Sequence, residues 1–301
     1  MGETASGDFS GNDVASVPSG QIAIQREIAI RAKIHQRHIA TARTKPAANR
    51  PLVFLAHGDS WFDYPLIDNG PFPGDTDVIH HLRQMGSINP LIVNMSHHGD
   101  STVDEMSLPK QQRVIATLQD SANWSDTGKP DAILFSGGGN DIAGEQFSIY
   151  LQTKTHATGN GLAIDRFERM LDGVEASYLA LFAFRDEHAP DVPIFGHCYD
   201  FGIPDGRHPI CSGPWISPSL KFAGYNVAEG RTIMRDCLER FKARLTALAA
   251  VPANNYTLVD TQGTLADNEW ANELHPKDDG FGKIAERFLT ALRLKFGVAR
   301  I

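Results

Sequence analysis

Five short apolar runs, spread over residues 51–263, constrain the fold of this chain more than any other feature. Each run is nearly continuous in Val, Ile, Leu and Phe, and each ends in a cluster of small and polar residues. Strands buried on both faces have this composition, because a half-buried strand alternates apolar and polar residues. The runs read PLVFLAHGDS, PLIVNMSHHGDS, DAILFSGGGND, VPIFGHCYDF and NYTLVDTQG.

Longer segments with helical periodicity follow the second to fifth runs, at residues 103–121, 165–189, 229–250 and 278–296. Strands that alternate with helices favour a parallel sheet with right-handed crossovers, which places helices on both faces. The sequence therefore predicts an α/β fold, a three-layer α/β/α sandwich around a central, mostly parallel five-stranded sheet. We see no internal repeat and no second core, so residues 51–301 are predicted to form one domain.

The N-terminal fifty residues differ from this pattern. Residues 1–20 are rich in Ser, Gly and Asp, which predicts a disordered tail. Residues 21–50 are basic and begin with a helical pattern, so we expect a basic N-terminal helical extension. Its isoleucine stripe needs burial, either on the body of the protein or against a second copy of the chain in a homo-oligomer. An arm that binds a partner, a membrane surface or nucleic acid is the alternative.

Composition excludes several classes of protein. The 301 residues are 42% apolar with a net charge of −8, which is ordinary for a globular protein and argues against nucleic-acid binding. No apolar run is long enough to predict a membrane span. No signal peptide is seen, so a cytoplasmic location is expected. Cys198, Cys211 and Cys237 do not make a disulfide framework and are expected to be free thiols; a Cys198–Cys211 pair in an oxidising compartment is the alternative.

Candidate catalytic residues follow the predicted strands. Ser60 ends the first run, Gly99 and Asn140 end the second and third, and His275 follows the last. Ligands bind beyond the carboxyl ends of parallel strands, so these residues are expected to meet there. A serine becomes a nucleophile when a nearby base takes its proton, which is the role expected of His275. The N–H groups of Ser60 and Gly99 and the Asn140 amide would form an oxyanion hole.

Four sequence blocks carry a family resemblance. They read HGDSWF with Ser60, NMSHHGDS with Gly99, GGGND with Asn140 and NELHP with His275. In this order the blocks resemble those of the SGNH (GDSL-type) hydrolase superfamily, over about residues 51–290. The resemblance implies a flavodoxin-like three-layer fold and a serine hydrolase of the esterase, lipase, thioesterase or carbohydrate-deacetylase type. It also implies that neither a metal nor an organic cofactor is needed.

One residue departs from the family pattern. Asn272 stands three residues before His275, where the family usually has an Asp that orients the imidazole. An Asp-to-Asn change in a serine-protease triad costs about 10⁴ in turnover, because the amide favours the wrong tautomer. Three alternatives stay open: Asn272 orients the ring, a backbone carbonyl does so, or a nearby carboxylate such as Glu273 or Asp267 substitutes. We predict Asn272.

The same residues allow other interpretations. His57, His97, His98 and His275, together with nearby aspartates, could suggest a metal site, but the spacing of common metallophosphoesterases is missing. His97 and His98 are rival bases for Ser60. A catalytically silent relative that binds acylated ligands or a protein partner is the alternative to an enzyme, because of Asn272 and the basic extension.

Three long connections are expected to shape the substrate pocket, at residues 62–80, 142–164 and 200–228. Six aromatic residues in or beside them are candidates for an apolar or sugar-stacking wall: Trp61, Phe62, Tyr64, Tyr199, Phe201 and Trp215. The sequence predicts a small-molecule, lipid or carbohydrate acyl ester as substrate, without choosing among them.

Overall fold

In the computed structural model, five strands form one sheet in which every neighbouring pair is parallel. The structure describes residues 19–70, 72–74, 76–125 and 127–301. The sheet has the order β2-β1-β3-β4-β5. The strands are β1 (Val53–Gly58), β2 (Leu91–Asn94), β3 (Ala132–Ser136), β4 (Ile194–His197) and β5 (Tyr256–Val259). The prediction of a five-stranded parallel sheet is confirmed.

Burial along the strands follows their position in the sheet. Every residue of β1, β3 and β4 is buried, as their continuous apolar composition predicts. The two edge strands are less covered, since Leu91 of β2 is half-buried and Thr257 of β5 is exposed. The core is therefore centred on the three middle strands, whose carboxyl ends carry two of the candidate blocks.

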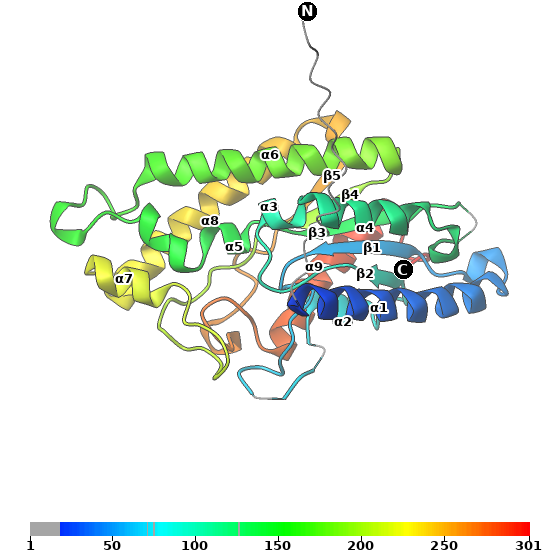
Figure 1. Ribbon diagram of the computed structural model, residues 1–301, viewed down its shortest axis with the longest axis horizontal. Coiled ribbons are helices and arrows are strands. Elements are labelled where there is room, and N and C mark those ends of the chain that lie inside the picture. The colour runs from blue at the N-terminus through cyan, green and yellow to red at the C-terminus, as the bar shows by residue number, and fades with distance from the viewer. Residues whose placement is uncertain (1–18, 71, 75, 126) are drawn as a thin grey trace, which may run out of the picture.

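Helices cover both faces of the sheet, which confirms the predicted three-layer sandwich (Figure 1). One layer holds α3 (Thr102–Glu105), α4 (Leu108–Gln119), α6 (Ile164–His188) and α8 (Val227–Ala249), and the other holds α2 (Val78–Leu82) and α9 (Asp278–Phe296). Two short helices, α5 (Gly139–Ile142) and α7 (Ser217–Ala223), lie in the connections after β3 and β4. Short 3-10 helices span Ala47–Asn49, Ser121–Asn123, Glu145–Tyr150, Lys154–His156, Pro252–Asn254 and Asp267–Glu269.

Two predicted segments need correction. The helix expected at 103–121 is two helices: Ser107 has extended backbone between them, and Pro109 lies in the first turn of the second. The connection 200–228 is not all loop, since α7 lies within it and ends at Gly224, whose φ is +94°. The helices predicted at 165–189, 229–250 and 278–296 lie within two residues of their observed bounds.

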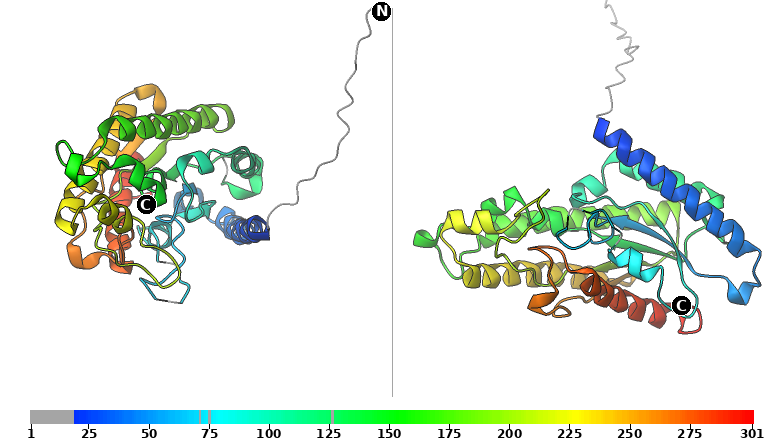
Figure 2. Two further views of the ribbon diagram at one scale, coloured as in Figure 1. Left: turned by 60° about the vertical axis from the view of Figure 1, so that its left-hand side comes forward. Right: turned by 90° about the horizontal axis from the view of Figure 1, so that it is seen from below.

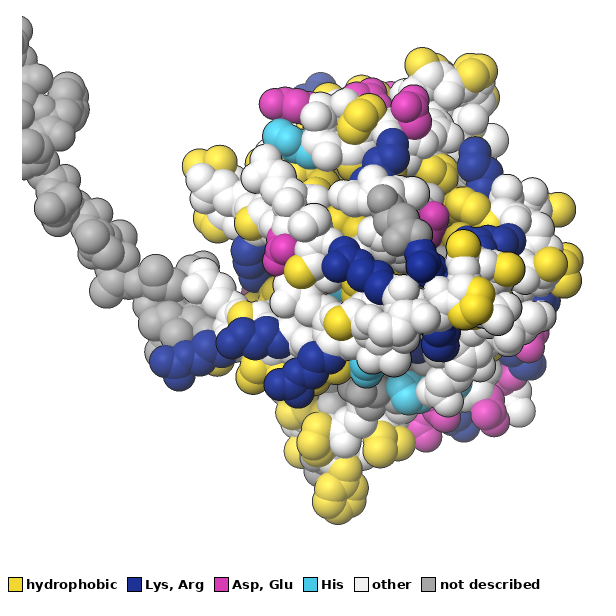
Figure 3. Space-filling view, turned by 90° about the vertical axis from the view of Figure 1, so that its right-hand side faces the viewer, with side chains coloured by type: hydrophobic (Ala, Val, Ile, Leu, Met, Phe, Trp, Pro, Cys, Tyr) yellow, Lys and Arg dark blue, Asp and Glu magenta, His cyan; other side chains and the backbone are white. Residues whose placement is uncertain are grey.

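The N-terminal helix α1 (Ser19–Arg43) packs beside β2, the edge strand, on the body of its own chain (Figure 2). Ile28 and Ile39 are buried by this contact. Arg31 anchors the helix, because it donates to the carboxylate of Asp63 and to the carbonyl of Ser96. The basic side chains of the extension lie mostly on the surface, and Figure 3 shows Lys and Arg side chains on the end of the molecule where α1 finishes. Residues 1–18 of the predicted disordered tail lie outside the described residues.

Two further expectations concern the described residues alone. No helix in the described part of the chain is both long and apolar enough to cross a membrane. Cys198 and Cys237 are buried and unpaired and Cys211 is exposed and unpaired, so the alternative Cys198–Cys211 disulfide is not formed.

Candidate active site

A tight turn at the end of β1 presents Ser60. Gly58 has a φ of +148°, and a Cβ there would overlap the carbonyl of Ser136 on the neighbouring strand, so only glycine fits. The Asp59 N–H donates to that carbonyl at 2.9 Å. The Asp59 carboxylate then accepts the N–H of Trp61 at 3.0 Å, which closes the turn around Ser60.

Asp59 supports the site without facing the reacting atoms. Its buried carboxylate accepts hydrogen bonds from Ser136 Oγ at 2.6 Å and from Tyr199 OH at 2.5 Å. Burial raises the pKa of Asp59 to about 6, against the effect of these donors. Asp59 therefore fixes the Tyr199 ring beside Ser60, and the aspartate of the Gly-Asp-Ser tripeptide has a structural role.

Ser60 and His275 form a hydrogen-bonded pair. Ser60 Oγ lies 2.7 Å from His275 Nε2, and both residues are buried, with 7% and 5% of their surface exposed. Burial lowers the pKa of His275 to about 3, because the charged imidazolium loses its hydration. At neutral pH the ring is therefore neutral, which is the state that can accept the serine proton.

Asn272 holds the other side of the imidazole. Its Oδ1 lies 3.0 Å from His275 Nδ1 and also accepts the backbone N–H groups of Leu274 and His275. Two backbone donors identify this atom as the amide oxygen, since an NH₂ group in that place could not accept them. An amide oxygen can only accept, so Nδ1 carries the proton, while the Ser60 hydroxyl can donate to the unprotonated Nε2.

Tyr64 and Asn69 hold the same amide from its other end. Asn272 Nδ2 donates to Tyr64 OH at 2.9 Å and to Asn69 Oδ1 at 3.3 Å. Asn69 is itself held, because its amide nitrogen donates to the carbonyl of Ala271. The Asn272 amide therefore cannot flip without losing hydrogen bonds at both ends, and the unproductive tautomer that an Asp-to-Asn change can favour is disfavoured here.

The two candidate carboxylates lie elsewhere. Glu273 is fully buried and accepts four backbone N–H groups, from Gly206, Trp215, Ile216 and Ser217. Asp267 is exposed and pairs with Arg231. Of the three alternatives for the residue that orients His275, the geometry places Asn272 at the ring and both carboxylates away from it.

The three expected oxyanion donors come from three separate segments of the chain. Asn140 lines the same cavity as Ser60 and His275, and its Nδ2 donates one hydrogen to the carbonyl of Asp100 at 2.9 Å. This bond joins Asn140 to the segment of Gly99, which is exposed with a φ of +85°. The N–H groups of Ser60 and Gly99 have no acceptor within the described residues, so both remain available to a substrate oxygen.

Comparisons with known proteins bear on the fold. No family model and no curated protein matches the chain in sequence. Among solved structures, the lipase Lip_vut3 from a goat rumen metagenome is 15% identical with a TM-score of 0.50, over 80% of this chain and 97% of that one. The chain shares the three-layer fold of this lipase.

Two further solved structures align less well. An extracellular lipase from Streptomyces rimosus is 16% identical with a TM-score of 0.47, over 80% of this chain and 99% of that one. A carbohydrate acetylesterase family member from Sinorhizobium meliloti is 14% identical with a TM-score of 0.47, over 82% and 99%. The predicted three-layer fold therefore rests on the sheet and helices described above and on the lipase Lip_vut3.

The two rival histidines have partners other than Ser60. His97 and His98 stack on each other with ring centroids 4.4 Å apart, and face the carboxylates of Asp100 and Asp63. Neither hydrogen-bonds to Ser60, so the rival bases are not in place. Within the ranges that the structure describes, no three or more His, Cys, Asp and Glu side chains gather in a way that could hold a metal ion.

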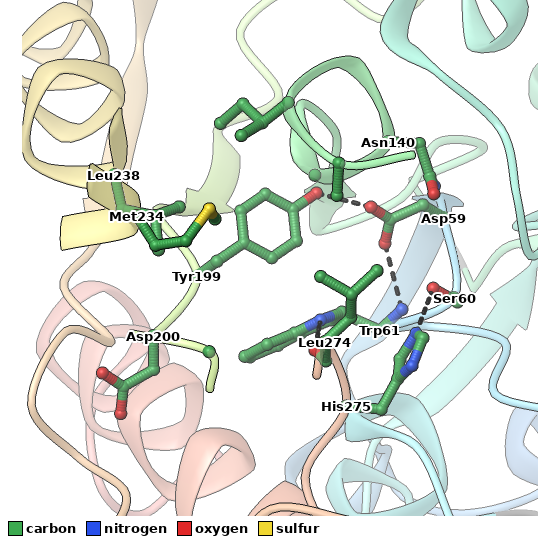
Figure 4. Close-up of a pocket in the computed structure, with 14 residues that line it drawn as sticks. Asp59, Ser60, Trp61, Asn140, Tyr199, Asp200, Met234, Leu238, Leu274 and His275 are labelled. Carbon is green, nitrogen blue, oxygen red and sulfur yellow. Dashed lines mark hydrogen bonds between the residues drawn. The ribbon is translucent and has the colours of Figure 1, made fainter. Parts of the chain in front are cut away.

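The predicted aromatic wall divides into separate groups. Trp61 and Tyr199 line the cavity next to Ser60 (Figure 4). Tyr64 stacks on His275 at 4.4 Å and Trp215 meets the same ring edge-on at 5.7 Å. Phe62 is in the core, and Phe201 lies under Arg235. Sequence reasoning missed Asn69, Met234 and Leu238, because an isolated Asn and two apolar residues of a long helix carry no signal of their own.

Proposed function

We propose that this protein is a serine hydrolase that cleaves a carboxylic ester or thioester through an acyl-serine intermediate. The observation that carries the proposal is the 2.7 Å contact between Ser60 Oγ and a neutral His275 Nε2, with the tautomer set by Asn272. The lipase that shares the fold agrees with this proposal.

The reaction follows from the geometry in two halves. His275 Nε2 takes the Ser60 proton while Oγ attacks the carbonyl carbon, and the carbonyl oxygen becomes an oxyanion. That oxygen accepts from the N–H groups of Ser60 and Gly99 and from the second amide hydrogen of Asn140. The tetrahedral species then collapses, His275 gives the proton to the leaving alcohol or thiol, and the acyl group stays on Ser60.

Water completes the cycle by the reverse arrangement. His275 removes a proton from water, the hydroxide oxygen attacks the acyl carbon, and the same donors hold the second oxyanion. Collapse breaks the bond between the acyl carbon and Ser60 Oγ, and His275 returns the proton to the serine. The free acid leaves, and the resting pair is restored.

Labelling with a fluorophosphonate probe tests the nucleophile. The folded protein is expected to be labelled at neutral pH, and Ser60→Ala is expected to abolish both labelling and ester hydrolysis. Ser136→Ala is a matched control, because Ser136 is also a buried serine that contacts a histidine, His197, but lies behind Asp59. A folded protein that is neither labelled nor active would favour the alternative, a silent relative that binds acylated ligands or a partner.

A further inference from the structure

A small cavity extends from Ser60 toward α8. Its volume is about 40 Å³, and its wall is mostly apolar. Figure 4 shows Met234 and Leu238 of α8 at the end away from Ser60 and His275, with Tyr199 and Trp61 between. Ile142 and Leu274 complete the apolar lining.

Polar groups in the wall are already used by the protein. Tyr199 OH donates to the Asp59 carboxylate, so neither group is offered to a ligand. The carboxylate of Asp200, which also lines the cavity, accepts the N–H groups of Gly263 and Leu265. Apart from Asn140 beside Ser60, the polar side chains of the wall are thus already paired, which favours a plain hydrocarbon chain toward α8.

The position of His275 indicates which half of an ester enters the cavity. Its Nε2 must return a proton to the leaving oxygen, so the alcohol or thiol has to lie on the side of the imidazole. Met234 and Leu238 lie across the cavity from that ring (Figure 4). The chain that points toward α8 is therefore the acyl chain.

The volume of the cavity limits the length of the acyl chain. The cavity has only about 40 Å³, which is small for a substrate chain. Resting on the function proposed above, we propose that the acyl substrates are short, uncharged groups, and that Met234 and Leu238 set the upper limit.

The side wall is too firmly packed to give way to a longer chain. Tyr199 has a φ of +56°, and its ring lies 5.2 Å from Trp61 and 5.8 Å from Phe241. The ring also lies so close to Gly139 that a Cβ there would press on it. The limit is therefore set at the end of the cavity, where two side chains of one helix can be shortened by substitution.

A series of p-nitrophenyl esters tests the inference, with acetate, butyrate, hexanoate and octanoate as acyl groups. We expect kcat/KM to be highest for acetate or butyrate and at least about tenfold lower for octanoate. Leu238→Ala and Met234→Ala are expected to raise the octanoate-to-butyrate ratio by about tenfold, because each opens the closed end. Leu245→Ala is the matched control, since Leu245 is buried on the same helix but does not line the cavity.

The outcomes separate this inference from the proposed function. Fluorophosphonate labelling of Ser60 together with a wild-type preference for octanoate would overturn the chain-length limit and leave the hydrolase. Equal ratios in Leu238→Ala, Met234→Ala and Leu245→Ala would overturn the role of the two α8 residues. Absence of both labelling and turnover with every ester would overturn the hydrolase itself, and the inference with it.

Discussion

The two sides of Ser60 are built differently. On the side of residues 272–275, the imidazole is buried and both of its nitrogens have hydrogen-bond partners, Ser60 and Asn272. On the side of residues 97–100, Gly99 is exposed and its N–H has no acceptor in the described part of the chain. The groups proposed to transfer the serine proton are thus hydrogen-bonded to each other in the free protein. The N–H groups proposed to bind the substrate oxygen have no acceptor there.

This difference separates two contributions to the activation free energy of the proposed hydrolysis: preparation of the base and stabilisation of the oxyanion. A base held in one tautomer needs no reorganisation, and unpaired donors gain their partner only when charge develops on the substrate. Substitutions on the base side should therefore act through tautomer and pKa. Substitutions on the donor side should act through stabilisation of the oxyanion.

The largest effect is expected from Asn272→Leu, which removes the oxygen that faces His275 Nδ1. We expect kcat to fall by about 10³-fold or more, because the ring is free to adopt the tautomer that protonates Nε2. Steady-state kinetics measure the loss, and thermal unfolding measures whether the fold survives.

Asn272→Asp is the matched comparison. It keeps the oxygen at Nδ1 but turns the donor toward Asn69 into a second acceptor. Activity should stay within about tenfold of the wild type or rise, while the free energy of unfolding falls by about 1–3 kcal/mol. A loss of activity as large as that of Asn272→Leu would show that another group orients His275.

Asn140→Ala tests the side of Ser60 that carries the proposed oxyanion donors. Loss of one oxyanion donor lowers kcat by about 10²–10³-fold with little change in KM. Asn160→Ala is the control, because Asn160 also donates from its amide, to Asp236, but lies outside the cavity. An equal effect of the two variants, or an effect of Asn140→Ala on KM alone, would argue against the assignment.

The pH profile tests the buried base. Because burial lowers the pKa of His275 to about 3, the ring stays neutral and active at pH 5, where an ordinary histidine would be roughly thirtyfold less so. We expect kcat/KM to hold from pH 7 to pH 5, and an acid limb near pH 6.5 would contradict this.

The stability of the protein in acid limits the pH range over which this profile can be measured. Burial also lowers the pKa of His35 and His57 to about 4 and of His197 to about 3. The unfolded chain therefore binds more protons below pH 6.5, and acid favours unfolding, while the raised pKa of Asp59 opposes this in part. Circular dichroism at each pH separates a loss of fold from protonation of the base.

Tyr64→Phe tests how far the hydrogen bonds of the Asn272 amide contribute to the orientation of His275. It removes the hydroxyl that accepts from Asn272 Nδ2 and leaves Asn69 in place. A fall in kcat of about three- to tenfold is expected, since the amide is then held by one weaker partner. Tyr225→Phe, whose hydroxyl donates to the carbonyl of Gln152 far from the site, should leave kcat unchanged.

The smallest effect concerns the anchor of α1. Arg31→Ala releases Asp63 and the Ser96 carbonyl, which belong to the two segments that carry Ser60 and Gly99. We expect kcat to fall about threefold, as the donors lose alignment. Arg43→Ala removes a different anchor of the same helix, to the carbonyls of Ser121 and Trp124, and should lower stability without this effect.

Much of the fold was readable from local pattern. The continuous apolar runs predicted the buried strands, and the blocks at their ends included Ser60, Asn140 and His275, which line one cavity. The expected helix at 103–121 was divided, because Ser107 and Pro109 start a new helix within an otherwise periodic segment. Helix α7 was missed, since it is short and lies among Gly and Pro residues.

The orientation of the Asn272 amide could not be predicted from local sequence pattern. Its amide is set by Tyr64 and Asn69, which lie more than 200 positions earlier in the chain. The size of the cavity depends in the same way on Met234 and Leu238, which look like ordinary core residues of an amphipathic helix. Long-range contacts of single side chains leave no periodic trace in a sequence.

Glu273 ties the chain segment next to His275 to the loop that carries Trp215. One carboxylate accepts four backbone N–H groups of residues 206–217, so a movement of that loop would also displace the chain next to His275. Opening of this loop would therefore move the His275 imidazole away from Ser60. We therefore expect substrate to enter on the side of the exposed Gly99, where movement of the chain does not disturb the contact between Ser60 and His275.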